Sequence, residues 1–534
     1  MAFLRVEKKK SGTYLRIVEG FRQNGKIKHK TLYSLGKVED YPPEQLQRIA
    51  TKLLQLAGGR VEDILKDDLK ELRRVNYGYA LVIKHLWKKL NLDEWMRKIN
   101  YKRHIHFDCL STLELMIAER LNEPCSKLSN FNHQQEYIGF GDKPIELHHF
   151  YRTLDVLEKE QESLKKHLFT TQQNLFSTEL DIVFYDVTTL YFDSDEVKEG
   201  SIRQKGYSKD GKAHKIQVVL GLLIDKFRNP ITYHVYQGNT YEGSTMIKAL
   251  EDLKSKFHIN KGIVVADSGM IDKSNREYIE QQEGLDYILG DSIKVLPKEI
   301  SSFLIDKKNH HALYLGGENF SYATTMYNGR RIICTYSEKR AEKDRREREK
   351  LIEKAKKLLQ NSSVLKQIKK RGAGRYIKQT SEENYNLDKE KIKADEKWDG
   401  FKALATTTDL PVVEVIEKYA DLFEVEHAFR TLKSQLEIRP MYHWTDKRIK
   451  GHIAMCFIAY SMLNYLRLVT GLQPKDIIRA LDHMQLSEIQ EGEKQETFYL
   501  RSSISFEQRK LIDTLKLVVP KDTTPQRLIH QYFK

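Results

Sequence analysis

The chain of 534 residues has few cysteines and no long apolar run. Cys109, Cys125, Cys334 and Cys456 lie far apart and form no Cys-x-x-Cys pair, which argues against a zinc ribbon and a disulfide framework. The start, MAFLRVEKKKSG, lacks an apolar core, so we expect no signal peptide. The longest apolar stretch, residues 453–466, is too short to span a membrane, and we expect a buried helix there. These absences favour a cytoplasmic protein with no membrane partner.

Positive charge is what the chain has in excess. Lys and Arg number 90 against 75 Asp and Glu, which gives a net charge of +15. A surplus of this size favours a polyanionic partner, most simply nucleic acid, although a merely soluble basic protein is the alternative. Hydrophobic residues make up 40% of the chain, and its length suffices for about three or four domains.

The first 175 residues combine a strand-like part with a helical part. Alternating runs flank Asn24-Gly25, which predicts a β-hairpin. Lys26, Lys28 and Lys30 share one face of its second strand, where they are either solvated or in contact with phosphates. Helical spacing of apolar residues follows, and such a bundle is compatible with a helix-turn-helix. We predict a basic hairpin over residues 1–44 and a helical DNA-binding domain over residues 45–175.

Residues 176–292 show an α/β pattern in the order β-β-β-α-β-α-β. Residues 181–192, DIVFYDVTTLYF, are rich in β-branched and aromatic side chains on both faces, which is typical of a central strand. Asp186 lies in the middle of this strand, and Asp267 lies at the end of the fourth strand. A charge inside an apolar strand is costly, so Asp186 is either capped within the fold or bound to a cation.

The pattern is interrupted over residues 293–400. Strands turning at Asn328-Gly329 are followed by a highly charged helix and by the basic stretch 366–378, which is either solvated or in contact with nucleic acid. We expect Trp398 to belong to the core. Residues 401–475 return to a strand followed by helices, and residues 476–534 read as an accessory tail.

One stretch, YADLFEVEHAFRTLKSQL (residues 419–436), predicts a single amphipathic helix. Glu426 lies beside its apolar stripe, with Arg430 and Lys433 on the same side. In a lone helix this is a solvated ion pair. A helix packed on the sheet would instead bring Glu426 to Asp186 and Asp267. Three such carboxylates suit Mg²⁺ or Mn²⁺, and two ions about 4 Å apart promote phosphoryl transfer.

The chain resembles the DDE transposases of bacterial insertion sequences, in the group with a Y-R-E-K motif. Tyr419, Glu426 and Lys433 match this motif, whereas Leu422 stands where the motif has Arg. Arg430 or Arg439 would replace the missing phosphate contact. The local matches are FYDVTTLYF, ADSGM, WDGFKALATTT and FRTLK, and the resemblance covers about residues 175–470.

The resemblance implies a multidomain α/β (α+β) protein. A ribonuclease-H-like mixed-sheet core over residues 176–292 and 401–475 would be interrupted by a mainly β insertion over residues 293–400, and it would follow a helical DNA-binding region. Two Mg²⁺ or Mn²⁺ ions would be held by Asp186, Asp267 and Glu426. DNA would be contacted by Tyr419, Arg430, Lys433 and Arg439.

The activity implied is DNA transposition by a cut-and-paste route. A homodimer would hold two transposon ends by their inverted terminal repeats, cleave the 3′ strands and join them to target DNA, and the protein would associate with the nucleoid when bound to DNA. One alternative is a metal-dependent nuclease of the same fold. Another is a non-catalytic DNA-binding protein descended from a transposase, which the presence of all three carboxylates argues against.

Overall fold

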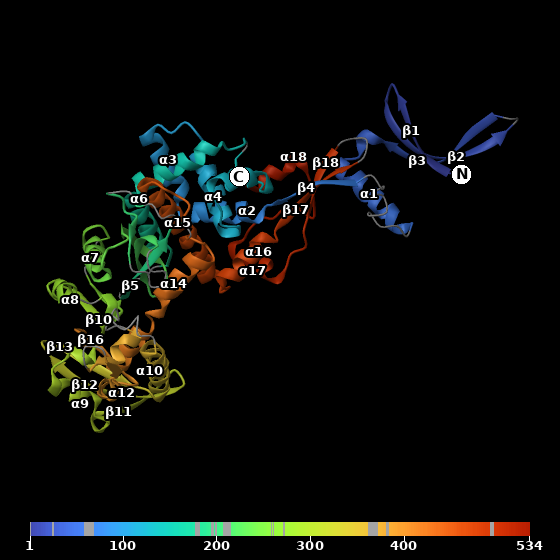
Figure 1. Cartoon of the computed structure of the whole chain (residues 1–534). Helices are drawn as coiled ribbons and strands as arrows, with labels where there is room; N and C mark the ends of the chain where they lie inside the picture. Colours follow the sequence, from blue (N-terminus) through green and yellow to red (C-terminus); the bar gives the residue numbers. More distant parts are fainter. Residues whose placement is uncertain are drawn as a thin grey trace. The chain divides into compact units, whose positions relative to one another are not determined.

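The computed structural model contains two compact units (Figure 1). It describes residues 2–533 apart from residues 24–25, 58–68, 142, 177–181, 194–196, 198–199, 207–214, 258, 260, 271–272, 361–371, 381–383, 440 and 492–495. The Asn24-Gly25 turn, the first residue of the predicted strand 181–192 and residues 366–371 of the predicted basic stretch therefore lie outside the described residues. The N-terminal unit comprises Met1–Arg73 and Ser487–Leu500, and the main unit comprises Arg74–Leu486 and Arg501–Lys534.

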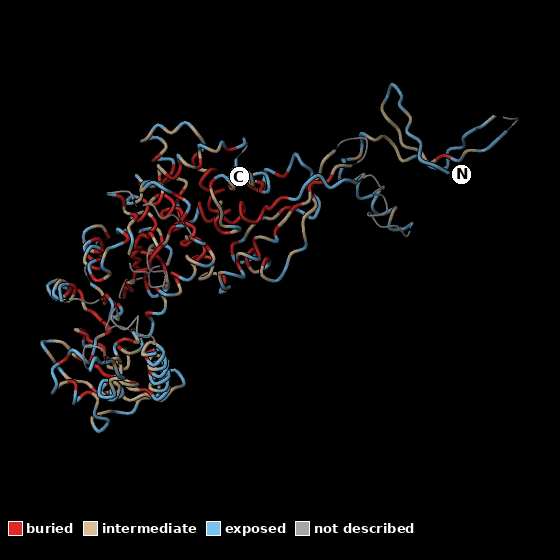
Figure 2. The backbone as a smooth tube through the Cα atoms, in the orientation of Figure 1, coloured by how far each residue is buried: buried red, intermediate tan, exposed pale blue. Residues whose placement is uncertain are grey.

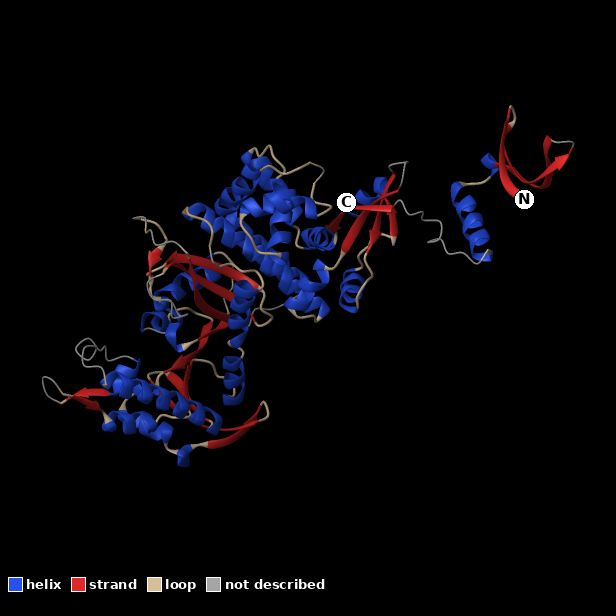
Figure 3. Ribbon diagram, turned by 45° about the vertical axis from the view of Figure 1, so that its right-hand side comes forward, coloured by secondary structure: helices blue, strands red, loops and turns tan. Residues whose placement is uncertain are grey.

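The N-terminal unit contains an antiparallel sheet and a helix, which Figure 3 shows in red and blue. Strands β2 (Gly12–Gln23) and β3 (Lys26–Lys37) pair on either side of residues 24–25, which confirms the predicted hairpin. Strand β1 (Ala2–Lys9) adds a third strand along β2 that the sequence did not predict. Helix α1 (Pro43–Leu56) follows and buries none of its residues.

Helices form the part of the main unit that precedes the central sheet. They are α2 (Gly78–Lys89), α3 (Leu92–Arg103), α4 (Cys109–Asn122), α5 (Lys127–His133) and α6 (Leu147–Phe176). α2 and α3 are separated at Asn91, whose φ of 54° lies in the left-handed region that Asn tolerates better than most residues. The helical character predicted for this region is confirmed.

Helix α15 (Asp446–Thr470) is a core helix that packs against α4 and α6. In length and composition it is the one helix among the described residues that is apolar enough to cross a membrane, but 78% of its apolar window is buried within the protein. Figure 2 shows this burial as red tube along α15 and the neighbouring strands. The buried helix predicted over residues 453–466 is thus confirmed.

A mixed ten-stranded sheet forms the centre of the main unit. Its order is β11-β12-β13-β16-β10-β9-β5-β7-β6, and β8 also pairs with β7. The five strands predicted over residues 176–292 are all present, as β5 (Ile182–Tyr191), β7 (Ile216–Asp225), β8 (Pro230–Gln237), β9 (Gly262–Ala266) and β10 (Leu285–Asp291). β5, β9 and β10 run parallel, and β5, β7 and β8 run antiparallel. A short strand, β6 (Gln204–Lys205), was not predicted.

Two helices lie between the parallel strands along the chain. α7 (Met246–Ser255) precedes β9, and α8 (Lys273–Glu280) precedes β10. Met246, Leu250 and Leu253 of α7 belong to one buried apolar cluster with side chains of β5 and β9. Because Tyr185 and Val187 of β5 belong to this cluster, Asp186 between them points to the other face of the sheet.

Strands after residue 293 continue the same sheet. β13 (Arg330–Tyr336) pairs with β16 (Phe401–Thr406), which in turn pairs antiparallel with β10. β11 (His311–Leu315) and β12 (Glu318–Tyr327) extend the sheet beyond β13. This part also contains α9 (Lys298–Ile305), α10 (Glu338–Leu359), β14 (Ile377–Gln379), β15 (Tyr385–Leu387) and α12 (Lys389–Glu396).

The division of the chain into six domain ranges stays a prediction.

Regular elements continue to the C-terminal end of the described chain. They are α16 (Pro474–Asp482), β17 (Gln485–Glu491), β18 (Glu496–Arg501), α17 (Phe506–Leu515), β19 (Thr523–Pro525) and α18 (Gln526–Ile529). Strand β4 (Leu69–Asn76), β17 and β18 each have residues in both compact units. The sequence did not predict β4.

Candidate active site

Two aspartates occupy equivalent positions on the neighbouring parallel strands β5 and β9. Tyr185 pairs with Ala266, and the next residues along the two strands are Asp186 and Asp267. Neighbouring strands lie about 4.8 Å apart, so the two carboxylates start from adjacent backbone positions on the same face of the sheet. Asp186 is half-buried and Asp267 is exposed.

The stretch predicted as one helix over residues 419–436 is two helices in the structure. α13 (Val412–Ala420) ends just after Tyr419, and α14 (Phe423–Ser434) begins three residues before Glu426. The prediction of a single helix was wrong because the two segments pack on different strands: α13 contacts β9 and β10, whereas α14 contacts β5 and β7. The break between them allows each helix to follow its own part of the twisted sheet.

Helix α14 is held on the sheet by an apolar face and by an ion pair. Val425, Ala428, Phe429 and Leu432 are buried, which leaves Glu426 exposed in the first turn.

Glu424, two residues before Glu426, forms an ion pair with Arg228 in the turn between β7 and β8. The carbonyl of Arg228 accepts a 3.0 Å hydrogen bond from the hydroxyl of Tyr460 on α15. The start of α14 is therefore fixed to the turn, and through the turn to the core helix.

Tyr419 links α13 to Asp267. Its hydroxyl donates a 3.1 Å hydrogen bond to Oδ1 of Asp267, which also accepts a 2.7 Å bond from the backbone N–H of Ser268. The hydroxyl lies against Gly290 of β10, where a Cβ atom would be only 2.5 Å away. Burial, and then the charge of Asp267, raise the pKa of Tyr419, so the phenol keeps its proton and remains a donor.

A cleft of about 740 Å³ opens beside these side chains. Asp267, Tyr419 and Glu426 line it together, and Asp186 does not belong to its lining. Charged residues of α10 line it as well, among them Arg340. Helix α10 is fixed to the loop before β16, because Asp344 accepts a 3.0 Å hydrogen bond from the N–H of Gly400 and Arg348 forms an ion pair with Asp399.

Lys402 of β16 brings a positive charge to the carboxylates. Its Nζ lies 4.3 Å from the centroid of the Tyr419 ring, within the range of a cation–π contact. Burial and then the charge of Arg340 lower the pKa of Lys402, whereas Asp267 and Glu426 act in the opposite sense. Lys402 therefore lies within electrostatic reach of both carboxylates.

The three carboxylates together form a donor set that fits hard divalent cations. Asp186, Asp267 and Glu426 offer carboxylate oxygens, the ligands that Mg²⁺ and Mn²⁺ prefer. Among the described residues, Ser268 and Tyr419 donate their hydrogen bonds to Oδ1 of Asp267. The other oxygen of this carboxylate, Oδ2, is therefore available to a cation.

Among the described residues, the three carboxylates do not form a cluster whose ligand atoms all lie within 4.8 Å of one another.

The residues predicted to contact DNA differ in their exposure. Arg430 is exposed, and Lys433 is half-buried. Arg439 lies over the ring of Tyr191 on β5, with 5.1 Å between the guanidinium carbon and the ring centroid. Tyr419 is only 6% exposed. Their contacts with DNA stay predictions.

Leu422, at the motif position of an arginine, is buried at the junction of α13 and α14. An apolar side chain suits this buried position. Trp398 packs against the buried cluster of the sheet, as expected, and it also lines the cleft.

Sequence reasoning missed three residues of the site: Lys402, Arg340 and Gly290. Lys402 is the charge in the apolar strand FKALAT, a signal of the same kind as Asp186 in its strand. Arg340 was hidden in a helix in which nearly every residue is charged, and Gly290 in an ordinary Leu-Gly-Asp strand end.

Comparison with known proteins shows the family. A family model described as "Transposase DDE domain" matches residues 177–462, more than half of the chain, and includes Asp186, Asp267 and Glu426. The chain therefore belongs to the DDE transposase family. A second family model, "IS1634 family transposase, N-terminal domain", matches residues 4–63. The protein is thus an insertion-sequence DDE transposase, and its recognition from the sequence motifs is confirmed.

No curated protein matches the chain. Among solved structures, a Mos1 transposase paired-end complex with the left transposon end shares 14% identity, with a TM-score of 0.14. A Mos1 mariner paired-end complex with Mn shares 12% identity, also with a TM-score of 0.14. Each match covers 33% of this chain and 57% of the Mos1 chain, so this chain spans little more than half the length of those relatives.

Proposed function

We propose that the protein cuts and pastes its own insertion sequence. It binds the inverted terminal repeats, cleaves the 3′ strand at each end with two divalent ions, and joins the freed ends to target DNA. The observation that carries this proposal is the equivalent placement of Asp186 and Asp267 on parallel strands, beside a cleft that Asp267 shares with Glu426. A ribonuclease-H-like core, with β11–β13 as the insertion, is part of the proposal.

Each carboxylate has a separate support in the fold. Asp186 and Asp267 are held by the β5–β9 ladder, and Glu426 by the packing of α14. Mg²⁺ or Mn²⁺ bound there supplies Lewis acidity, which activates an attacking oxygen and stabilises the leaving oxygen of a phosphodiester. Tyr419 orients Asp267 by its hydrogen bond, and Lys402 offers a cation where phosphate charge would enter the cleft.

Partners and location follow from charge and chemistry. The net charge of +15 supports binding of double-stranded DNA, with Arg430, Lys433 and Arg439 as candidate contacts. Joining two ends in one reaction calls for a homodimer that holds both of them. The four cysteines are free thiols, which supports the proposed cytoplasmic location.

The test uses the full-length protein with DNA that carries two transposon ends and with a supercoiled target. Asp186→Asn, Asp267→Asn and Glu426→Gln should each abolish Mg²⁺-dependent cleavage, while binding to a single end remains close to that of the unaltered protein. Glu417→Gln, an exposed carboxylate on α13, is the matched control and should cleave normally. Normal cleavage by any one of the three variants would remove that residue from the metal site. Nicking without joined products would instead identify a nuclease.

A further inference from the structure

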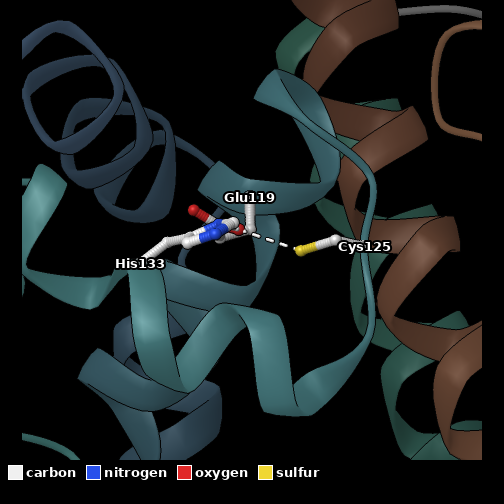
Figure 4. Close-up of side chains that lie close together, drawn as sticks. All are labelled: Glu119, Cys125 and His133. Atoms are coloured by element: carbon white, nitrogen blue, oxygen red, sulfur yellow. Dashed lines mark hydrogen bonds and ion pairs between the residues drawn. The ribbon is translucent and has the colours of Figure 1, made fainter.

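A second group of side chains that could bind a metal lies in the helical region, which precedes Asp186, Asp267 and Glu426 in the sequence. It consists of Glu119 near the end of α4, Cys125 in the following loop and His133 at the end of α5 (Figure 4). One carboxylate oxygen, one sulfur and one imidazole nitrogen all lie within 4.8 Å of one another. Figure 4 shows the three side chains converging from two helices and the loop that joins them.

The spacing of these atoms is close to the edge lengths of a tetrahedral metal site. Cys125 Sγ lies 3.1 Å from Glu119 Oε2, and His133 Nδ1 lies 3.6 Å from the same oxygen. Metal–ligand distances of about 2.0 to 2.3 Å around Zn²⁺ place neighbouring ligand atoms roughly 3.3 to 3.7 Å apart. A tetrahedral ion therefore fits among these atoms with only small side-chain movements.

The ligands are already oriented by a neighbouring amide. Asn130 Nδ2 donates 3.0 Å hydrogen bonds to both Glu119 Oε2 and Cys125 Sγ. Hydrogen-bonded neighbours of this kind fix the orientation of metal ligands. The side chain of Glu119 is 2% exposed, whereas that of His133 is 36% exposed, so an ion can enter from the His133 side and keep one solvent ligand there.

Cys125 donates a hydrogen bond to Glu119 Oε2, so without metal the thiol proton lies between these two ligand atoms. When a divalent ion binds, the thiol proton is released and a thiolate–metal bond forms, so the ion meets two negative ligands and one neutral one.

We propose that Glu119, Cys125 and His133 form a Zn²⁺-binding site that anchors the loop between α4 and α5. The donor set of sulfur, imidazole and carboxylate favours Zn²⁺ over Mg²⁺, which prefers oxygen ligands alone. The site is therefore chemically distinct from the carboxylate site at the cleft.

Arg120 of α4 links this loop to the chain that leaves the Glu426 helix. Arg120, the residue after Glu119, donates a 3.1 Å hydrogen bond to the carbonyl of Cys125. It also donates 3.3 Å bonds to the carbonyls of Leu436 and Glu437, just beyond α14. Zn²⁺ on Glu119 and Cys125 would hold Arg120 between them and thereby fix the C-terminal end of the segment that carries Glu426.

Cobalt titration of the full-length protein tests this site directly. Metal-depleted protein should develop a thiolate-to-cobalt charge-transfer band in the near ultraviolet, with an amplitude that corresponds to one Co²⁺ bound to Cys125. Cys125→Ser should lose the band. His133→Gln, at a half-exposed position that tolerates the change, should weaken Co²⁺ binding by at least the roughly 10- to 100-fold that loss of a ligand's hydrogen-bond partner costs.

Two controls separate this site from other metal sites. Glu426→Gln should leave the band intact, because the carboxylate site contains no sulfur. His148→Gln, in the cluster of Glu146, His148 and His149, should also leave it intact. Absence of the band in the unaltered protein, or its persistence in Cys125→Ser, would overturn the proposal.

Thermal unfolding gives an independent readout. Zn²⁺ added to the metal-depleted protein should raise the unfolding midpoint, because an ion that binds only the folded state stabilises it. The rise should be absent in Cys125→Ser and smaller in His133→Gln. An equal rise in all three proteins would also contradict the site.

Discussion

The hydroxyl of Tyr419 donates a hydrogen bond to Asp267 from a notch that only glycine at position 290 leaves open. Three segments distant in sequence meet at this point: the end of β9, the end of β10 and the last turn of α13. The orientation of the Asp267 carboxylate therefore depends on a phenol in another helix and on a missing side chain in the neighbouring strand.

Replacement of Tyr419 by Phe removes one hydrogen bond without opening a cavity. We expect a stability loss of about 1 kcal/mol, the usual net value of such a bond. Because the freed carboxylate is less well oriented, the rate of end cleavage should fall more than the affinity for end DNA. Tyr442→Phe, at an exposed tyrosine, is the control and should change neither quantity. Unchanged single-turnover cleavage by Tyr419→Phe would show that the bond plays no part in positioning Asp267.

Replacement of Gly290 by Ala should displace Tyr419. The new Cβ would lie 2.5 Å from the tyrosine oxygen and 3.0 Å from the N–H nitrogen of Ser268, and overpacking of this kind costs about 1 to 3 kcal/mol. The double variant Gly290→Ala with Tyr419→Phe should be destabilised less than the sum of the two single variants, because the closest contact is gone. Urea unfolding of the four proteins measures this coupling, and strict additivity would exclude the notch as the cause.

Gly451 of α15 faces the backbone of α6. A Cβ there would lie 2.1 Å from the carbonyl oxygen of Leu154. Helix propensity alone favours Ala over Gly by about 1 kcal/mol, but the collision with rigid backbone outweighs it. We expect Gly451→Ala to lower the free energy of unfolding by about 1 to 3 kcal/mol. Gly20→Ala, whose nearest contact would be 3.7 Å away, should be much milder. A stabilised Gly451→Ala protein would contradict the close packing of the two helices.

Glu114 makes stability depend on pH. Burial raises its pKa to about 7 from the ordinary value of 4.5, and its Oε2 has no hydrogen-bond partner among the described residues. The folded protein therefore holds a proton that the unfolded chain releases between these two values, so the free energy of unfolding falls as pH rises through this window.

Glu114→Gln removes the titrating group and should unfold at a higher urea concentration than the unaltered protein above pH 7. The difference should shrink as the pH is lowered to about 5. Urea unfolding at a series of pH values measures it, and a difference that stays constant across the series would mean that Glu114 does not titrate in the folded state.

The strands that carry the aspartates could be predicted from the sequence, because apolar residues on both faces indicate a strand that is buried on both sides. DIVFYDVTTLYF is apolar on both faces, as a central strand must be, and Asp186 is its conspicuous exception. The helix that carries Glu426 was predicted with the correct type but as one piece with Tyr419. Nothing in YADLFE, which lacks Pro and Gly, indicates the break. The break arises from packing on different strands, and periodicity does not contain that information.

The sequence also did not predict that the sheet continues from β10 through β16 and β13 to β11. Pairing partners in a sheet are chosen by tertiary contacts, and β16 lies more than a hundred residues from its partner β10. Lys402 and Gly290 enter the site through that pairing, so their roles could not be assigned before the strand order was known.

The unbroken ladder from β7 to β11 has a mechanical consequence. The strands that carry Asp186 and Asp267 and the strand that precedes α10 belong to one hydrogen-bonded sheet, and to swing them apart would break backbone hydrogen bonds in a row. The strands that carry these residues therefore keep fixed positions relative to one another.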